Sequence, residues 1–335
     1  DLHLWHTLSL HDALPIWRNL REHVFPLRCA PAEREQILAC LREPIAALPA
    51  YADGTEYALS EMSPVSRRLL SERRLITEDV CENRVAQAAF VARDQLASAL
   101  VNGEDHLQLR GLQPGVNFEP LKARLRAAHA ALAEELAFAC HEDWGYLTSD
   151  PAKAGTATAA CTMHLPALGL AGQLPQVMGA AQALGLGARG RRSRGERLVG
   201  NLVTFTTAAT LESGGGHGPE ARLTETVRRI ADAERQARAL VLETQGELMF
   251  DLVARAYGML RYAFRLHENE ALNMLSALRL GCEIGMLDAM DAHRVDELMV
   301  CCRRGHLQHG LTGTGGPDEH KNALPTLLRR ELMPQ

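Results

Sequence analysis

The seven residues Val101-Asn102-Gly103-Glu104-Asp105-His106-Leu107 decide how this chain is expected to fold. Small and apolar residues alternate over 95–101, and Leu107 and Leu109 alternate with polar neighbours, so we expect a strand on each side. Between the strands, Asn102-Gly103 is a dipeptide typical of tight turns. Acidic and imidazole side chains would then stand together at a strand-turn-strand junction, although an ordinary polar hairpin turn has the same appearance.

Three further stretches stand out along the chain. They are Trp144–Pro151 (WGYLTSDP) with Gly155-Thr156 after it, Met163–Leu168 (MHLPAL), and Gly187–Gly190 (GARG) with Gly200-Asn201 after it. The third stretch opens a run of arginines over 189–197. Such a run is most often a solvated loop, and the functional alternative is an anion-binding site.

The hydrophobic spacing divides the chain into three parts. Apolar residues recur every three to four positions over 32–48, and Ser63-Pro64 has the N-cap and first-turn proline of a second helix. The middle mixes helices over 118–139 and 168–184 with strands near 84–92, 95–101, 106–111, 156–165 and 198–210. From Pro219 onward the spacing is helical. We therefore expect an α+β fold, with an antiparallel sheet flanked by helices and a C-terminal helical region.

The composition argues against several classes of function. The 335 residues carry a formal net charge of -5, which gives no sign of the basic surface of a nucleic-acid-binding protein. No apolar run reaches the eighteen residues that a membrane helix needs. The eight cysteines form no CxxC pair with metal-site spacing, so reduced thiols and a cytoplasmic location are expected.

The first sixteen residues, Asp1–Ile16, show no clean period and resemble translated sequencing-adapter fragments. We expect residues 1–16 to be a non-native segment, with native sequence beginning near Trp17. The alternative is an ordinary N-terminal segment.

In this order and spacing, the four stretches together resemble the ATP:guanidino phosphotransferases. Three further blocks, Leu59–Pro64 (LSEMSP), Arg255–Gly258 (RAYG) and Leu278–Gly281 (LRLG), resemble the bacterial protein-arginine kinases within that family. The resemblance runs from about Trp17 to about Gln308. It implies a guanidino-kinase catalytic domain over 17–218 and a helical C-terminal region over 219–335.

The resemblance also implies a chemistry: transfer of the γ-phosphoryl group of MgATP to the guanidinium of a protein arginine. It assigns the catalytic carboxylates to Glu104 and Glu196, and it assigns ATP phosphate binding to Arg18, His106, Arg189, Arg191 and Arg192. Magnesium would be carried by ATP, without protein side-chain ligands. Glu104, His106 and Arg189 are then expected to line one cleft.

Several positions depart from the family pattern where the chemistry is expected. Gly103 replaces a glutamate, Gln108 an arginine, Asp150 a cysteine and Arg194 the second glutamate, and no arginine stands near Thr158. The alternative function is therefore a catalytically degenerate pseudokinase that acts as a regulatory binding module. By resemblance, the partners are a protein substrate or regulators such as a zinc-binding activator and the Clp unfoldase. A homodimer is compatible with the resemblance, and no nucleic-acid or membrane partner is expected.

Overall fold

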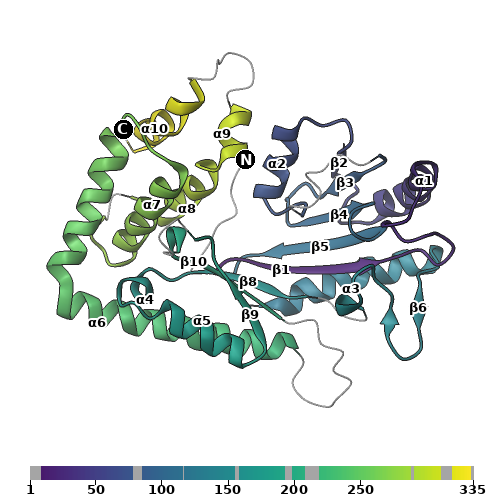
Figure 1. The fold of residues 1–335 in the computed structure, drawn as a ribbon, viewed down its shortest axis with the longest axis horizontal. Coiled ribbons are helices and arrows are strands. Elements are labelled where there is room, and N and C mark those ends of the chain that lie inside the picture. The colour runs from purple at the N-terminus through teal and green to yellow at the C-terminus, as the bar shows by residue number, and fades with distance from the viewer. Residues whose placement is uncertain are drawn as a thin grey trace.

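The structure is a computed structural model, and it describes residues 9–77, 85–115, 117–154, 158–192, 198–207, 219–287, 290–310 and 319–332. An eight-stranded antiparallel sheet runs through the molecule, with helices on both sides and a group of C-terminal helices at one end (Figure 1). This arrangement confirms the expected α+β fold with an antiparallel sheet and a helical C-terminal region.

The strands of the large sheet follow the order β2-β3-β4-β5-β1-β8-β10-β9. Their bounds are β1 (Ser9–Arg18), β2 (Thr55–Ala58), β3 (Ala88–Val91), β4 (Ala97–Val101), β5 (Leu107–Gln113), β8 (Ala160–His164), β9 (Leu186–Arg189) and β10 (Leu202–Thr207). A separate hairpin pairs β6 (Cys140–His141) with β7 (Gly145–Tyr146).

The helices fall into a set around the sheet and a C-terminal set. Around the sheet lie α1 (Pro31–Ala47), α2 (Pro64–Glu72), α3 (Phe118–Glu135), α4 (Pro166–Leu170), α5 (Leu174–Ala183) and two short 3-10 helices, η2 (Pro151–Lys153) and η3 (Val199–Asn201). The C-terminal set is α6 (Pro219–Tyr262), α7 (Glu268–Glu283), α8 (Ala292–Cys301), α9 (Arg304–Gly310) and α10 (Glu319–Glu331).

One face of the sheet is apolar and carries the main core. Leu109 of β5, Met163 of β8 and Phe205 of β10 are almost fully buried there against α1, α3, α5 and the first half of α6. Gly111 lets α3 approach β5 closely, because a Cβ at this position would overlap the side chain of Leu121. Burial of this face fixes the register of the sheet, since a slip of one residue would expose it.

The opposite face is polar along its central strands. Directly paired residues point to the same side of a sheet, and the pairs Arg189↔Thr204 and Thr204↔Thr162 place these side chains on one face. The pairs Trp17↔Gln108 and Pro15↔Arg110 extend the same face across β1 and β5. We call this surface the polar face.

The C-terminal helices build a second core around Leu260, Leu275, Leu278, Leu298 and Leu328. Helix α6 belongs to both cores: its N-terminal half packs on the sheet through Leu223 and Val227, and its C-terminal half enters the second core. A kink at Gln245 (φ -137°) separates the two halves. One long helix therefore joins the sheet to the C-terminal helices.

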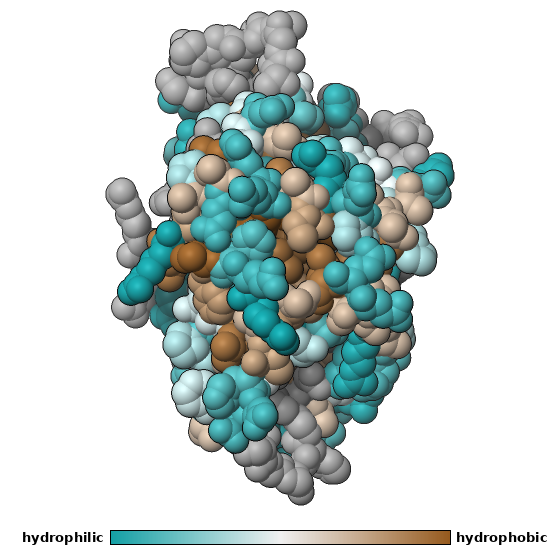
Figure 2. Space-filling model, turned by 90° about the vertical axis from the view of Figure 1, so that its right-hand side faces the viewer, coloured by the Kyte–Doolittle hydropathy of each residue, from teal (hydrophilic) through white to brown (hydrophobic). Residues whose placement is uncertain are grey.

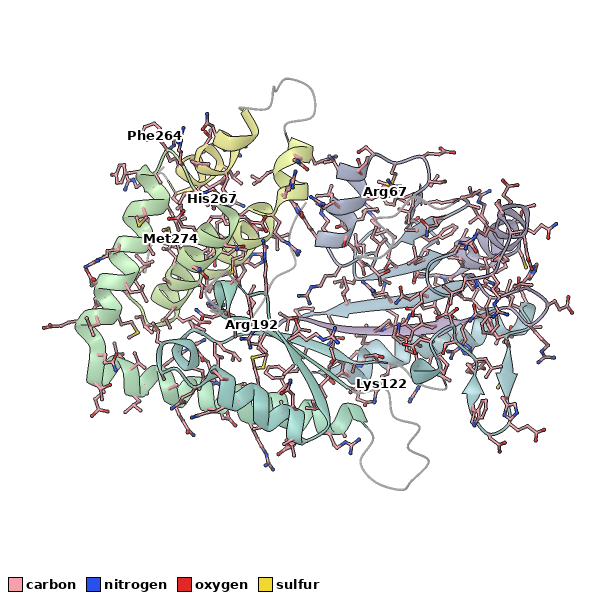
Figure 3. The ribbon with its side chains drawn as sticks, in the orientation of Figure 1. Arg67, Lys122, Arg192, Phe264, His267 and Met274 are labelled. Atoms are coloured by element: carbon pink, nitrogen blue, oxygen red, sulfur yellow. The ribbon has the colours of Figure 1, made fainter. Side chains whose placement is uncertain are left out.

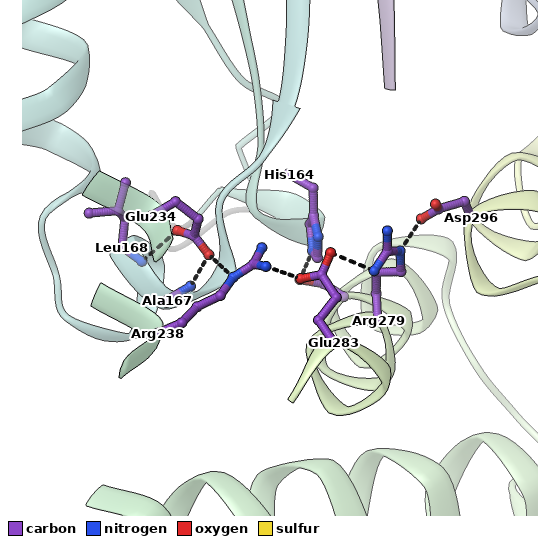
Figure 4. Close-up of polar contacts among 9 residues, drawn as sticks. His164, Ala167, Leu168, Glu234, Arg238, Arg279, Glu283 and Asp296 are labelled. Carbon is purple, nitrogen blue, oxygen red and sulfur yellow. Dashed lines mark hydrogen bonds and ion pairs between the residues drawn. The ribbon is translucent and has the colours of Figure 1, made fainter. Parts of the chain in front are cut away.

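A buried chain of alternating charges reinforces this junction (Figure 4). The Glu234 carboxylate accepts hydrogen bonds of 3.0 Å from the N–H groups of Ala167 and Leu168, at the start of α4, and one of 2.9 Å from Arg238. Arg238 pairs with Glu283, which pairs with Arg279, which in turn pairs with Asp296. Burial, opposed by Arg279, raises the pKa of Asp296 to about 6.

The structure also adds to the expectations at the N-terminal end. The expected boundary after Ile16 falls inside β1, which pairs with β5 on one side and β8 on the other. Ladder hydrogen bonds use backbone groups that every residue except proline supplies in full, so the pairing does not depend on the origin of the segment. The non-native origin of residues 1–16, and the domain limits 17–218 and 219–335, stay predictions.

His164 is expected to make stability depend on pH. Complete burial lowers its pKa well below 6.5, and its Nε2 lies 2.8 Å from Ser276 Oγ. The unfolded chain takes up a proton near pH 6.5 while folded His164 stays neutral, so stability falls as the pH drops below 6.5, by up to about 1.4 kcal/mol per pH unit from this group. Urea unfolding at pH 7, 6 and 5 should show a shallower loss in His164→Gln. The exposed His141→Gln control should keep the wild-type slope, and equal slopes in all three proteins would contradict the argument.

Glu72 is expected to hold α9 against α2. Its carboxylate accepts from Gly305 N (2.8 Å), His306 N (3.1 Å) and His306 Nδ1 (2.9 Å). Glu72→Ala leaves buried donors without an acceptor and should lower the free energy of unfolding by about 1–3 kcal/mol in urea titrations. Glu61→Ala, at an exposed position near the start of α2, should change it by less than about 0.5 kcal/mol. Similar losses in both variants would show that the α2–α9 contact adds nothing.

Candidate active site

The turn between β4 and β5 is held from both ends. Asn102 adopts a left-handed conformation (φ 57°), which asparagine tolerates better than most residues. Its N–H donates to His106 O (3.0 Å), and its Nδ2 donates to Arg34 O (2.9 Å) and Ala86 O (2.7 Å). The chain reverses between β4 and β5 as expected, but through residues 102–106 and not through a tight Asn-Gly turn. Hydrogen bonds hold the backbone of this longer turn in place.

Asp105 joins this turn to two other segments. Its Oδ1 accepts 2.6 Å hydrogen bonds from Asn19 Nδ2 and from Ser149 N. Asn19 completes the bridge, because its Oδ1 accepts from His106 N at 2.9 Å. Within the described residues, Asp105 Oδ2 and Ser149 Oγ are buried without a hydrogen-bond partner. The end of β1, the β4–β5 turn and the 147–150 segment therefore meet at one point.

His106 supports the backbone and does not face a ligand. It is fully buried; Leu20 N donates to its Nδ1 (3.0 Å), so Nε2 carries the proton and donates to Val24 O (3.0 Å). Burial lowers its pKa to about 4. Both ring nitrogens are hydrogen-bonded to the main chain, which leaves neither available for the phosphate contact expected from the sequence.

Glu104 projects from the turn as a partly exposed carboxylate. It forms an ion pair with Lys153 of η2, whose Nζ also lies 3.8 Å from Asp150 Oδ2. The same ammonium stands 5.2 Å from the centre of the Trp17 ring. Trp17 belongs to the polar face, so Glu104 stands at one end of that face.

Arg18 lies on the other side of the sheet. It follows Trp17 in β1 and therefore points to the opposite face. Its guanidinium stacks 3.7 Å from the centre of the Tyr146 ring, and its Nη1 donates to Trp17 O (2.6 Å). Burial lowers its pKa to about 10. The strand alternation thus removes Arg18 from the polar face, in contrast to the phosphate-binding role expected for it.

The three arginines expected after β9 take different positions. Arg189 is exposed on the polar face at the end of β9. Arg191 pairs with Glu268 of α7. The backbone of Arg192 forms an isolated β-bridge with that of Leu198. Arg192 lies near the centre of the molecule, where the sheet approaches the C-terminal helices (Figure 3). Glu196, the second expected carboxylate, lies outside the described residues.

The expected residues do not all converge. The row of paired residues through Arg189, Thr204 and Thr162 meets β1 at His11, whereas the Glu104 turn lies beyond the pair Arg18↔Leu107. His11 and Arg18 are seven residues apart, roughly 20 Å along a strand. Glu104 and Arg189 thus border the same face from separate positions, and His106 lies beneath it.

Two arginines that the sequence analysis overlooked lie between these positions. Arg110 Nη1 donates to Arg74 O (2.7 Å) and Ile76 O (3.2 Å), and Arg74 Nη1 donates to Thr162 Oγ1 (2.8 Å). Arg110 could have been found from strand alternation, because it stands two residues after Gln108 and shares its face. Arg74 had no such signal, since it reaches the sheet only through the end of α2.

An open groove of about 570 Å³ lies elsewhere, between α1 and the C-terminal end of α3. It belongs to the end of the molecule seen in Figure 2, where apolar side chains gather inside a hydrophilic rim. Its lining consists of Ala39, Cys40, Glu43, Pro44, Ala47, Glu135 and Leu136. This set has two carboxylates and no cation, so the groove does not suit phosphate. The polar face remains the candidate site.

Among the residues that the structure describes, no three His, Cys, Asp or Glu side chains gather in a way that could hold a metal ion. No helix in the same ranges is long and apolar enough to cross a bilayer.

Two family models match neighbouring parts of the chain, one on each side of the α6 kink. Residues 39–237 match the family model described as ATP:guanido phosphotransferase, C-terminal catalytic domain. Residues 246–335 match the model described as protein-arginine kinase McsB C-terminal domain. The kink at Gln245 falls between the two matched regions.

Individual relatives and solved structures agree with these matches. A protein named protein-arginine kinase from Exiguobacterium sp. is 33% identical over 97% of this chain and 92% of its own length. One from Moorella thermoacetica is 34% identical over 90% of this chain and 87% of its own.

Among solved structures, lombricine kinase has a TM-score of 0.57 at 20% identity, and the match covers 71% of each chain. A substrate-free duplicated taurocyamine kinase from Schistosoma mansoni has a TM-score of 0.56 at 20% identity over 70% of this chain, which spans 33% of that duplicated chain. The two structures show a shared fold, and the matched regions with the near-full-length relatives show that this chain belongs to the ATP:guanido phosphotransferase family, in the branch with the protein-arginine kinase C-terminal domain.

Proposed function

We propose that this protein transfers the γ-phosphoryl group of ATP to the guanidinium group of arginine side chains in proteins. Family membership and the relatives named protein-arginine kinase support the reaction class. The structural observation that carries the proposal is the position of Glu104: a partly exposed carboxylate, held by a rigid turn, at the end of an arginine-bearing polar face.

The proposed chemistry explains why a carboxylate is needed. A guanidinium is protonated near neutral pH and is therefore a poor nucleophile. Glu104 orients the guanidinium. It accepts a proton from the guanidinium as a guanidinium nitrogen bonds to the γ-phosphorus. The bond between that phosphorus and the bridging oxygen breaks, and ADP leaves. Glu196 would be the second carboxylate.

The polar face supplies the positive charge that such a transfer requires. Three arginines lie along it: Arg110, Arg74 and Arg189. Between them stand Thr162 and Thr204, whose hydroxyl groups are hydrogen-bonded to each other at 2.8 Å. Phosphoryl transfer depends mainly on positioning and charge stabilisation, which arginines provide well. We assign these three arginines to the triphosphate, and Arg191 and Arg192 stay candidates for it by the family resemblance.

The proposal includes MgATP as the phosphoryl donor. Magnesium is commonly held through nucleotide phosphates and water, and it neutralises charge on the phosphates when bound. The arginines of the polar face suit a polyphosphate that brings its own metal. The family resemblance supports three further parts of the proposal. They are a bacterial, cytoplasmic location, a homodimer, and regulatory partners such as a zinc-binding activator and the Clp unfoldase.

A regulatory module without catalysis is the alternative function. Gln108 is buried on the polar face where the family pattern has an arginine, and Glu104 is paired with Lys153. Arg110 offsets the first change because it adds a guanidinium to the same face of the same strand. The kinase proposal is therefore preferred, and the labelling experiments below decide between the two.

Glu104→Gln should abolish most phosphoryl transfer. Loss of a positioned base lowers the rate by about 10²- to 10⁴-fold. The measurement is transfer of labelled phosphate from MgATP to an arginine-rich protein, with acid-labile phosphoarginine as the product. Glu56→Gln is the matched control. Like Glu104, Glu56 is a partly exposed glutamate in an ion pair, here with Arg42 at 2.9 Å. Absence of labelling by the wild type would favour the regulatory module.

Arg110→Gln should weaken the use of ATP. Loss of one phosphate-directed donor is expected to lower kcat/KM for ATP by about 10²-fold. Arg124→Gln is the control, since Arg124 lies on α3 and pairs at 3.3 Å with an exposed Asp94. Thermal unfolding of both variants separates a lost phosphate contact from a disturbed α2. Unchanged kinetics in a folded Arg110→Gln protein would remove Arg110 from the site.

A further inference from the structure

Lys153 is surrounded by the groups that proteins use to bind organic cations. Its ammonium pairs with Glu104 and lies 3.8 Å from Asp150 Oδ2, and the Trp17 ring stands 5.2 Å away. These three groups come from the β4–β5 turn, the approach to η2 and strand β1. The bridge through Asn19, Asp105 and Ser149 holds the same three segments together.

This set of groups also suits a guanidinium. A pair of carboxylates can accept its planar, forked donors, and an indole face attracts its positive charge. A lysine ammonium satisfies the same charges with a more compact head on a flexible stem. The position therefore selects a cation, and a side chain of this protein already supplies one.

We propose that the Lys153 ammonium occupies the subsite of the substrate guanidinium, and that an incoming arginine side chain must displace it. This inference rests on the role proposed for Glu104. Lys153 thus sets the affinity and selectivity of the site for alkylguanidinium groups. It works as an internal competitor, and only a cation that can displace it reaches Glu104.

The exposure of the pair makes displacement feasible. The side chains of Lys153 and Glu104 are 25% and 35% exposed, so both can be reached from solvent. A structural staple between the two loops is the competing explanation, and under it removal of the lysine would loosen Glu104 and weaken cation binding.

Titration calorimetry with N-acetyl-arginine amide, in the absence of nucleotide, separates these explanations. Lys153→Met in the full chain should bind the probe about tenfold more tightly than the wild type, because a partly exposed ion pair and a cation–π contact no longer compete. Adding Glu104→Gln should remove the gain. Lys122→Met is the matched control: Lys122 pairs with Glu119 at 3.1 Å on α3, and its loss should leave the affinity unchanged.

Equal or weaker binding by Lys153→Met would overturn the inference, as would the absence of binding to both proteins at tens of millimolar probe. Phosphate labelling is measured in parallel. Tighter binding without labelling in either protein supports the cation site and counts against the proposed kinase activity. Labelling by the wild type without tighter binding in the variant retains the activity and rejects the internal competitor.

Discussion

The hydrogen bond from Asn19 to Asp105, together with the one that Asn19 accepts from His106 N, is the constraint on which the candidate site depends. Two buried side chains, far apart in sequence, join the end of β1 to the β4–β5 turn, and Ser149 N attaches a third segment to the same carboxylate oxygen. Buried polar groups are costly unless they are paired, so this bridge favours one arrangement of the three segments. Glu104, Asp150 and Trp17 owe their mutual positions to it.

Much of the fold could be predicted because its signals are local. The N-cap at Ser63, the turn at Asn102 and the apolar spacing of α1, α3 and the C-terminal helices each depend on a few neighbouring residues. Strands β1, β2 and β9 were not predicted. Each is short or lacks clear alternation, and is defined by its partners across the sheet. Pairing of that kind is a tertiary property, which single-sequence periodicity does not contain.

The site was predictable only in part for a related reason. The family resemblance located Glu104 and Arg189, but the roles of Arg18 and His106 depend on which face or layer each side chain enters. Arg18 is turned away by strand alternation, and His106 is consumed by backbone groups of Leu20 and Val24. No sign of a role for Lys153 is present in the sequence, because that role depends on the Glu104 carboxylate, which the fold places against it.

Helix α6 has a consequence for how the protein can be divided. Its two halves belong to different hydrophobic cores, and the buried charges of Glu234 and Arg238 lie on the half nearer the sheet. Proteolysis near Gln245 would therefore not release two self-sufficient modules. Once separated, each fragment would keep the half of α6 that packs in its own core but would lose the ion pair of Arg238 with Glu283 and the hydrogen bonds of Glu72 to α9. The two regions matched by separate family models should therefore melt as a single cooperative unit.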